Sequence, residues 1–137
     1  MTALTANKLI GEKEGKLIDC PVVGSDIIFK GAIVKHNAAG YLAPMSAEVG
    51  ASFAGIAFEK KDNSGGSAGD ISCRAIKSGL FLMVSSGLSQ SDVGSVVYAS
   101  DDQTVSTVQG ANEVAVGVIS KFVSATEVYV RIDGYAY

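Results

Sequence analysis

The amino-acid sequence predicts an all-β fold: a small β-barrel or sandwich built from two related halves, with an extended N-terminal arm and little helix. Short apolar segments alternate with turns rich in glycine, asparagine and aspartate along most of the chain, which is typical of antiparallel strands. In the last segment Val128, Val130 and Ile132 share one face, because side chains alternate across a strand. The same succession of segments occurs earlier in the chain, and this repetition predicts the two halves.

Four segments of the first half match four segments of the second half in the same order. The spacing from Gly31 to Gly55 differs by one residue from the spacing between Gly94 and Gly117. Regular turns make any β-rich chain resemble itself, so chance similarity is the alternative to an internal duplication. Two units are fewer than the ~3 that a stacked array needs, so we expect a duplicated domain and not a solenoid. The matched residues are 31–34 with 94–97, 41–45 with 104–108, 54–57 with 116–119, and 71–75 with 128–132.

The start of the chain has no clear period. We assign residues 1–25 to an N-terminal arm and residues 26–137 to the β-barrel domain. Residues 1–18 mix polar and apolar side chains, and chain termini are loose unless something fixes them. Three alternatives stay open for this segment: an arm that grips a neighbouring protein, a disordered tail, and a strand folded back on its own barrel.

Strand, turn and helix signals follow in order along the rest of the chain. Residues 45–52 are the only segment there that fits a short helix, and residues 60–69 have the composition of a flexible loop. Residues 80–84 are apolar on both phases, so we expect this strand to be covered on both faces, the second cover being another subunit. Strands are expected near residues 27–29, 32–34, 41–43, 54–58, 71–76, 80–84, 95–98, 104–108, 114–119 and 128–132, and a short polar turn or 3₁₀ piece at 89–92.

Composition and charge narrow the possible partners. The formal net charge is −3, and no cluster of Lys and Arg offers a footprint for phosphates, so we expect no nucleic acid. The longest apolar run, residues 80–84, is far short of the ~20 residues of a membrane span, and we expect no membrane contact. Charged residues make up 18% of the chain, against the ~25% that is usual. We therefore expect a partner to cover part of the surface.

Groups that carry out catalysis or hold metals are few. His36 is the only histidine and stands beside a turn, where a solvated side chain is expected. No Cys-X-X-Cys motif occurs, so no zinc site is expected. Cys20 and Cys73 lie far apart in the sequence, and a disulfide between them is not expected in a reducing compartment. Asp101 and Asp102 fit a turn, with a weak calcium site as the alternative. We therefore expect a binding or structural module with no enzymatic activity and no cofactor.

Several motifs in a fixed order carry a resemblance to a known family. They are residues 53–57 (Phe-Ala-Gly-Ile-Ala), 76–81 (Ile-Lys-Ser-Gly-Leu-Phe), 92–102 (opening with Asp-Val-Gly-Ser-Val-Val-Tyr), 116–119 and 128–132. In these motifs the chain resembles the capsid cement, or decoration, proteins of tailed bacteriophages, across residues 26–133. The resemblance implies a small β-barrel on the outside of an icosahedral head, commonly a trimer, that bridges neighbouring subunits of the major capsid protein. Residues 1–23 are the least similar part.

The resemblance, taken with the residue pattern, assigns two candidate surfaces. The arm residues Leu4, Lys8, Leu9 and Ile10 are the expected contacts with the major capsid protein, and Leu80, Phe81, Leu82 and Met83 are the expected interface of a homotrimer. The expected location is the outer surface of the virion head, after assembly from the host cytoplasm. The alternative function is a virion-surface module that binds glycans or cell surfaces through exposed tyrosines, namely Tyr41, Tyr98, Tyr129, Tyr135 and Tyr137.

Overall fold

The computed structural model describes residues 2–10 and 15–133. Twelve strands and one 3₁₀ helix make up the regular structure of this part of the chain, which confirms the all-β prediction. In the described residues, no helix has the length and apolar character that a membrane crossing requires. The strands are β1 (Leu17–Pro21), β2 (Ile27–Ile28), β3 (Ile33–His36), β4 (Leu42–Pro44), β5 (Ser52–Ala57), β6 (Lys61–Asp62), β7 (Ser72–Ile76), β8 (Gly79–Val84), β9 (Val96–Ala99), β10 (Val105–Ser106), β11 (Val114–Ser124) and β12 (Glu127–Ile132), and the 3₁₀ helix η1 is Gln90–Asp92.

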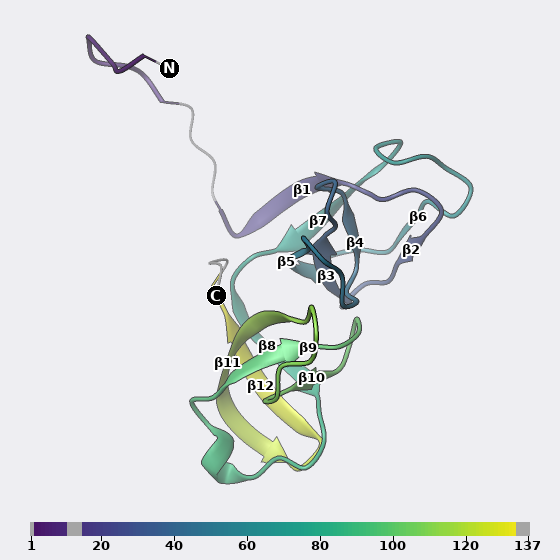
Figure 1. Cartoon of the computed structure of the whole chain (residues 1–137), viewed down its shortest axis with the longest axis vertical. Coiled ribbons are helices and arrows are strands. Elements are labelled where there is room, and N and C mark those ends of the chain that lie inside the picture. Colours follow the sequence, from purple (N-terminus) through teal and green to yellow (C-terminus); the bar gives the residue numbers. More distant parts are fainter. Residues whose placement is uncertain (1, 11–14, 134–137) are drawn as a thin grey trace.

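The strands form two five-stranded sheets, one above the other in Figure 1. The first sheet has the order β1-β7-β5-β3-β4 and the second the order β8-β12-β11-β9-β10, while β2 and β6 pair separately. Neighbouring strands in all three sheets are antiparallel. Parallel bridges join Val22 to Leu42 and Val84 to Thr104, which connects the two outer strands of each sheet. Each sheet thereby curls into a small barrel that is closed at this bridge.

The two barrels are built alike, as the internal repetition predicts. β1, β3, β4, β5 and β7 of the first barrel correspond in order and pairing to β8, β9, β10, β11 and β12 of the second. Gly55 and Gly117 stand at the same place, each beside a β-bulge. A Cβ at these glycines would collide with the carbonyl oxygen of Ile76 or of Arg131, respectively, so close strand contact requires glycine. Ile76 is therefore the counterpart of Arg131, which corrects the sequence match of Arg74 with Arg131 by two residues.

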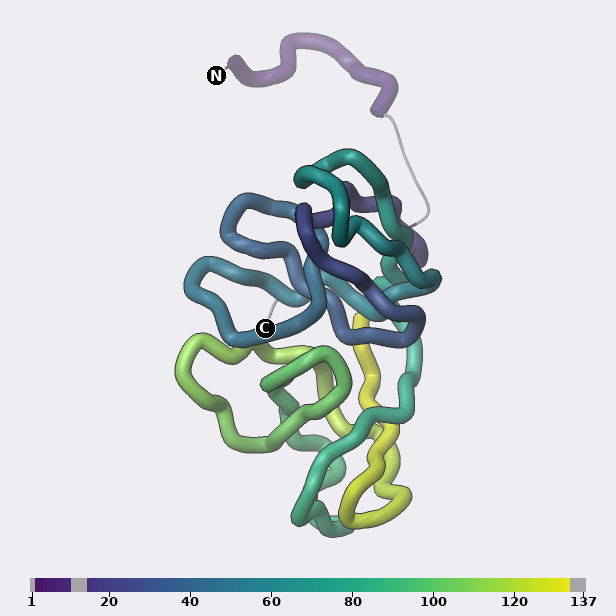
Figure 2. The backbone as a smooth tube through the Cα atoms, turned by 90° about the vertical axis from the view of Figure 1, so that its right-hand side faces the viewer, coloured from purple at the N-terminus to yellow at the C-terminus, as the bar shows by residue number. Residues whose placement is uncertain are grey.

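An apolar core fills each barrel, and the second core also joins the two barrels. In the second core, residues of β8, β9, β11 and β12 pack with Ile33, Met45 and Ile56 from the first half. The backbone N–H of Ile33 donates to the carbonyl of Asp102 over 2.8 Å. The two barrels therefore pack as one unit, as the side view in Figure 2 shows. The first core consists of Cys20, Val22, Ile28, Ala32, Val34, Leu42, Ala54, Ala57, Cys73 and Ala75.

The predicted boundary of the arm at residue 25 lies too far along the chain. β1 pairs with β7, and Cys20 and Val22 are buried in the first core. Exposed residues such as Asp19 alternate with the buried ones on β1, and the short strand was therefore hard to distinguish from an irregular segment. Outside the barrels, the described part of the arm is residues 2–10. The charged residues 12–14 of the predicted arm lie outside the described residues.

Residues 45–52, where a short helix was expected, are not helical. Met45 is buried in the second core. The side chains of Ser46 and Glu48 accept hydrogen bonds from Lys35 on β3. The Lys35 ammonium donates to Ser46 Oγ over 2.7 Å and to Glu48 Oε1 over 2.8 Å, while Glu48 Oε2 accepts the N–H of Ala38. These long-range bonds hold the segment against β3 in an irregular conformation with a turn at residues 49–50, and local helix propensity is overridden.

Residues 60–69, expected to be a flexible loop, are held by one buried side chain. The side-chain amide of Asn63 donates to the carbonyls of Val23 and Ser67 over 2.9 and 3.0 Å, and the main-chain carbonyl of Asn63 accepts the N–H of Ser25. A Cβ at Gly66 would collide with Asn63 Oδ1, so glycine is needed for this packing. The polar turn expected at residues 89–92 is confirmed as η1, capped by the side chain of its own Asp92.

Candidate interaction surfaces

The described arm, residues 2–10, projects away from both barrels in the two perpendicular views of Figures 1 and 2. All of its side chains are exposed. Leu9 is 97% exposed, Ile10 74% and Leu4 72%, and Lys8 adds a positive charge between them. Three large apolar side chains so fully open to water are typical of a segment that binds a partner.

β8 presents a second apolar surface. It is the outer strand of its sheet and pairs along its length with β12. Phe81 and Met83 point inward and pack in the second core. Leu80, Leu82 and Val84 point outward and are 58%, 49% and 43% exposed. We call these three residues the β8 strip.

The strip changes one prediction made from the sequence. The apolar run predicted a strand covered on both faces, and the single chain covers only the inner face. Of the four expected interface residues, Leu80 and Leu82 are available to a partner, whereas Phe81 and Met83 belong to the barrel's own core. Val84, which ends the same apolar run, belongs to the outward set but was not among the four expected interface residues.

The matching strand of the first barrel gives an internal comparison for the strip. Leu17 on β1 faces Ile76 as Leu80 on β8 faces Arg131, so the two leucines are counterparts. By the same register, Asp19 and Pro21 on β1 correspond to Leu82 and Val84 on β8. All three outward residues of β1 are exposed, and only its first is a large apolar residue. The barrel fold therefore does not require apolar side chains at the last two positions of the strip.

Charged and aromatic residues border the strip on the neighbouring strand. Glu127, Tyr129 and Arg131 of β12 stand opposite Val84, Leu82 and Leu80, in that order. A partner on this surface would meet an apolar row with a positive group near one end and a negative group near the other. A hollow of about 470 Å³ lies at the Arg131 end of the strip, between β8, β11 and β12.

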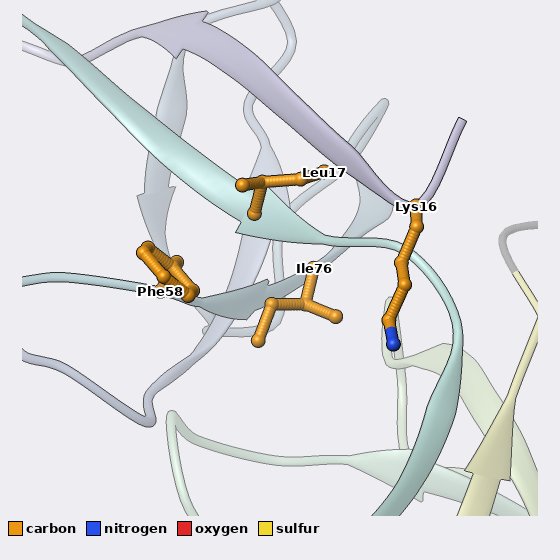
Figure 3. A pocket seen from close by; sticks show the side chains of 4 residues that line it. All are labelled: Lys16, Leu17, Phe58 and Ile76. Atoms are coloured by element: carbon orange, nitrogen blue, oxygen red, sulfur yellow. The ribbon is translucent and has the colours of Figure 1, made fainter. Parts of the chain in front are cut away.

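A further apolar hollow lies at the root of the arm. It has a volume of about 330 Å³ and is lined by Leu17, Phe58 and Ile76, with the side chain of Lys16 beside them (Figure 3). Sequence reasoning missed this hollow, because its residues come from β1, β7 and the segment after β5 and no single stretch carries the pattern. The guanidinium of Arg74 lies 4.7 Å from the centre of the Phe58 ring on the same part of the surface.

The titratable groups outside these surfaces are placed by ion pairing, by burial or by a turn. The Arg74 guanidinium binds both oxygens of Glu59 and lowers the pKa of that carboxyl to about 2. Burial lowers the pKa of His36 and raises the pKa of the Cys73 thiol to about 11. Asp101 Oδ1 accepts the N–H groups of residues 103 and 104, which agrees with the predicted turn. Among the described residues, no group of three His, Cys, Asp or Glu side chains could hold a metal ion.

The three tyrosines of the alternative function that the structure describes do not gather on one surface. Tyr41 lies in the first barrel, whereas Tyr98 and Tyr129 lie on β9 and β12, with β11 between them. Each of these three side chains is half-buried. Tyr135 and Tyr137, the other two tyrosines named for glycan binding, lie outside the described residues.

Comparisons of this chain with family models, curated proteins and solved structures found no match. The functional assignment therefore depends on the two surfaces described above, the arm and the β8 strip, and on the motifs in the sequence.

Proposed function

We propose that this protein is a structural virion protein that decorates the outside of a phage head and stabilises the shell by bridging subunits of the major capsid protein. The observation that carries the proposal is the pairing of a fully exposed apolar arm with an exposed apolar strip on an otherwise well-packed double barrel. The arm is the capsid contact, and the strip is the contact between copies of this chain. The protein acts on the outer surface of the head and reaches it from the host cytoplasm.

A single arm gains little free energy on binding, so several arms have to bind together. Burying Leu4, Leu9 and Ile10 gains about 2 kcal/mol each, while fixing the backbone of the residues between them costs about 1 to 2 kcal/mol each. One arm alone therefore binds weakly. Three arms carried by one trimer bind neighbouring capsid subunits at high effective concentration, which strengthens binding by ~10² to 10⁴.

The β8 strip supports the self-association that this avidity needs. Leu80, Leu82 and Val84 form a continuous apolar row on an outer strand, and a closed ring of copies would remove it from water. A stable interface buries on the order of 800 Å² per partner. Contacts therefore extend beyond the strip, and the adjoining residues of β12, Tyr129 and Arg131, are the proposed continuation.

Deleting residues 2–10 tests the arm. The truncated protein is expected to keep the fold and the oligomeric state of the full chain, because these residues lie outside both cores. Its binding to heads that lack the protein is expected to fall by at least ~100-fold in a cosedimentation assay. Val108→Asp is the matched control, because Val108 is 74% exposed but lies on the second barrel. Equal capsid binding by the truncated and full-length proteins would contradict the arm's role.

A further inference from the structure

Two cysteines stand face to face on neighbouring strands of the first barrel. Cys20 of β1 and Cys73 of β7 are directly opposite in the antiparallel register. The N–H of Val22 donates to the carbonyl of Ile71 over 2.9 Å, and the N–H of Lys77 donates to that of Lys16 over 2.7 Å. Hydrogen-bonded pairs recur at every second position, so Cys20 and Cys73 also form such a pair, for which the Cα atoms lie ~5.5 Å apart.

The Cα separation of this pair lies in the range found for disulfide bonds. Cα atoms of bonded cysteines are most often ~5.5 to 6 Å apart. Directly opposed residues of an antiparallel pair project from the same face of the sheet, and both cysteines are buried in the first core. The two thiols are free in this structure. Opposed Cβ atoms in a sheet lie ~4.5 to 5.5 Å apart, at the wider end for a hydrogen-bonded pair, whereas those of a disulfide lie ~3.5 to 4.5 Å apart. β1 and β7 therefore have to draw together by on the order of 1 Å at this pair for the bond to form.

The second barrel shows that the fold does not call for cysteine at this position. Met83 of β8 faces Val128 of β12 at the corresponding place in the register, and both are buried. Ordinary apolar side chains therefore fill the equivalent part of the second core. The opposed cysteines are a feature of the first barrel alone.

We propose that Cys20 and Cys73 are a modification site that forms a cross-strand disulfide when the protein meets a small disulfide oxidant, such as oxidised glutathione. One cysteine thiolate attacks the S–S bond of the oxidant, forms a mixed disulfide and releases one glutathione thiolate. The second cysteine thiolate then attacks the protein sulfur and releases the other glutathione. The two protein thiols lose two protons and two electrons, and the oxidant is reduced to two thiols.

The bond forms slowly in the closed barrel and faster when β1 opens. Thiolates are the attacking species, and burial raises the pKa of both thiols, that of Cys73 to about 11. β1 is an outer strand, and the arm segment precedes it directly. Separation of β1 from β7 exposes both sulfur atoms together, whereas the rest of the barrel remains paired through β5, β3 and β4.

The consequence of the bond is a covalent anchor at the root of the arm. It would close a loop that runs from β1 to β7 and contains β2 to β6. Loops of this length gain more from closure than short ones, because the unfolded chain loses more freedom. The inference does not depend on the proposed function, since it concerns only the pairing of β1 with β7.

The experiment compares the full-length protein after incubation with oxidised glutathione and after incubation with dithiothreitol. Peptide mapping by mass spectrometry without reduction is expected to join the peptides of Cys20 and Cys73, and both thiols become inaccessible to an alkylating reagent after unfolding. The midpoint of thermal unfolding rises by on the order of 10 °C in the oxidised sample. Dithiothreitol reverses both changes.

Two variants serve as controls for the thermal shift. Cys20→Ala and Cys73→Ala each remove one sulfur and are expected to show equal unfolding midpoints in the two buffers. The wild-type comparison needs no substitution and stands even where a variant does not fold. Free thiols, or glutathione adducts alone, after oxidant treatment that includes a cycle of heating and cooling would overturn the proposal.

Discussion

Lys35 illustrates how single residues decide parts of this structure that local patterns do not. Its side chain is buried, and its ammonium is satisfied by Ser46 and by Glu48, which lie eleven and thirteen residues further along the chain. Asn63 does the same for the 60–69 segment by binding a carbonyl forty residues away. Buried polar groups of this kind require such partners. The sequence shows the residue types but not the partners of these side chains. The helix expected at residues 45–52 was wrong for that reason, whereas residues 63–69 form the expected loop and only its attachment by Asn63 was not predicted.

Gly55 carries the first residue-scale prediction. Its φ is +135°, and a Cβ there would overlap the carbonyl of Ile76 on β7. Gly55→Ala is expected to destabilise the protein by about 2 to 4 kcal/mol, because backbone has to move on both strands. Gly15→Ala, where the space is open, is expected to change stability by less than about 0.5 kcal/mol. Chemical denaturation checks both values, and equal midpoints for the two variants would rule out the close contact at Gly55.

Glu59 carries the second residue-scale prediction. Its bonds to Arg74 lower the pKa of the carboxyl from 4.5 to about 2 in the folded protein. The unfolded chain therefore binds a proton more readily, and the stabilisation present above pH 4.5 is lost as the pH falls toward 2. Glu59→Gln is expected to weaken the fall of the unfolding midpoint across this window, measured by thermal scans at a series of pH values. An unchanged pH profile would contradict the assigned pairing.

At the scale of elements, the strands were well predicted and the coverage of β8 was not. Alternation and turn residues located β8, β11 and β12, and the repeated order of segments foretold the two matching sheets. Side chains alternate between the two faces of β8, but every residue from Leu80 to Val84 is apolar. The sequence therefore does not show which of them face outward. The short strand β1 was assigned to the arm, for which a strand folded back on its own barrel was only one of three alternatives, because its buried positions include a cysteine and its exposed ones are mixed.

The β8 strip gives the prediction at this scale. Leu80→Ser together with Leu82→Ser is expected to leave the fold intact, because both side chains point away from the core. Self-association should weaken by ~100-fold or more, given about 1.5 to 3 kcal/mol for each leucine that a partner no longer buries. Sedimentation velocity over a dilution series measures the change. The control is Leu17→Ser, the counterpart of Leu80 on β1. An equal effect of that control would show that the strip is not the interface.

At the scale of the whole molecule, the parts that stabilise the fold differ from the parts that are proposed to bind partners. The two cores hold the body together, and Ile33, Met45 and Ile56 of the first half belong to the second core. The arm and the β8 strip add little to that core and are free to serve contacts. Sequence motifs led to the proposed virion role, whereas the hollow at the arm root depends on residues that only folding brings together. A rigid body with a projecting arm suits a protein that bridges neighbouring subunits of a shell.

Cosedimentation of the full-length protein with phage heads that lack it tests the central claim most directly. The two quantities measured are the number of copies bound per shell at saturation and the temperature at which the shell is disrupted. The account predicts saturable binding in multiples of three per repeating unit, together with a raised disruption temperature. Heads that bind no protein, or that bind it without any gain in heat stability, would contradict the account.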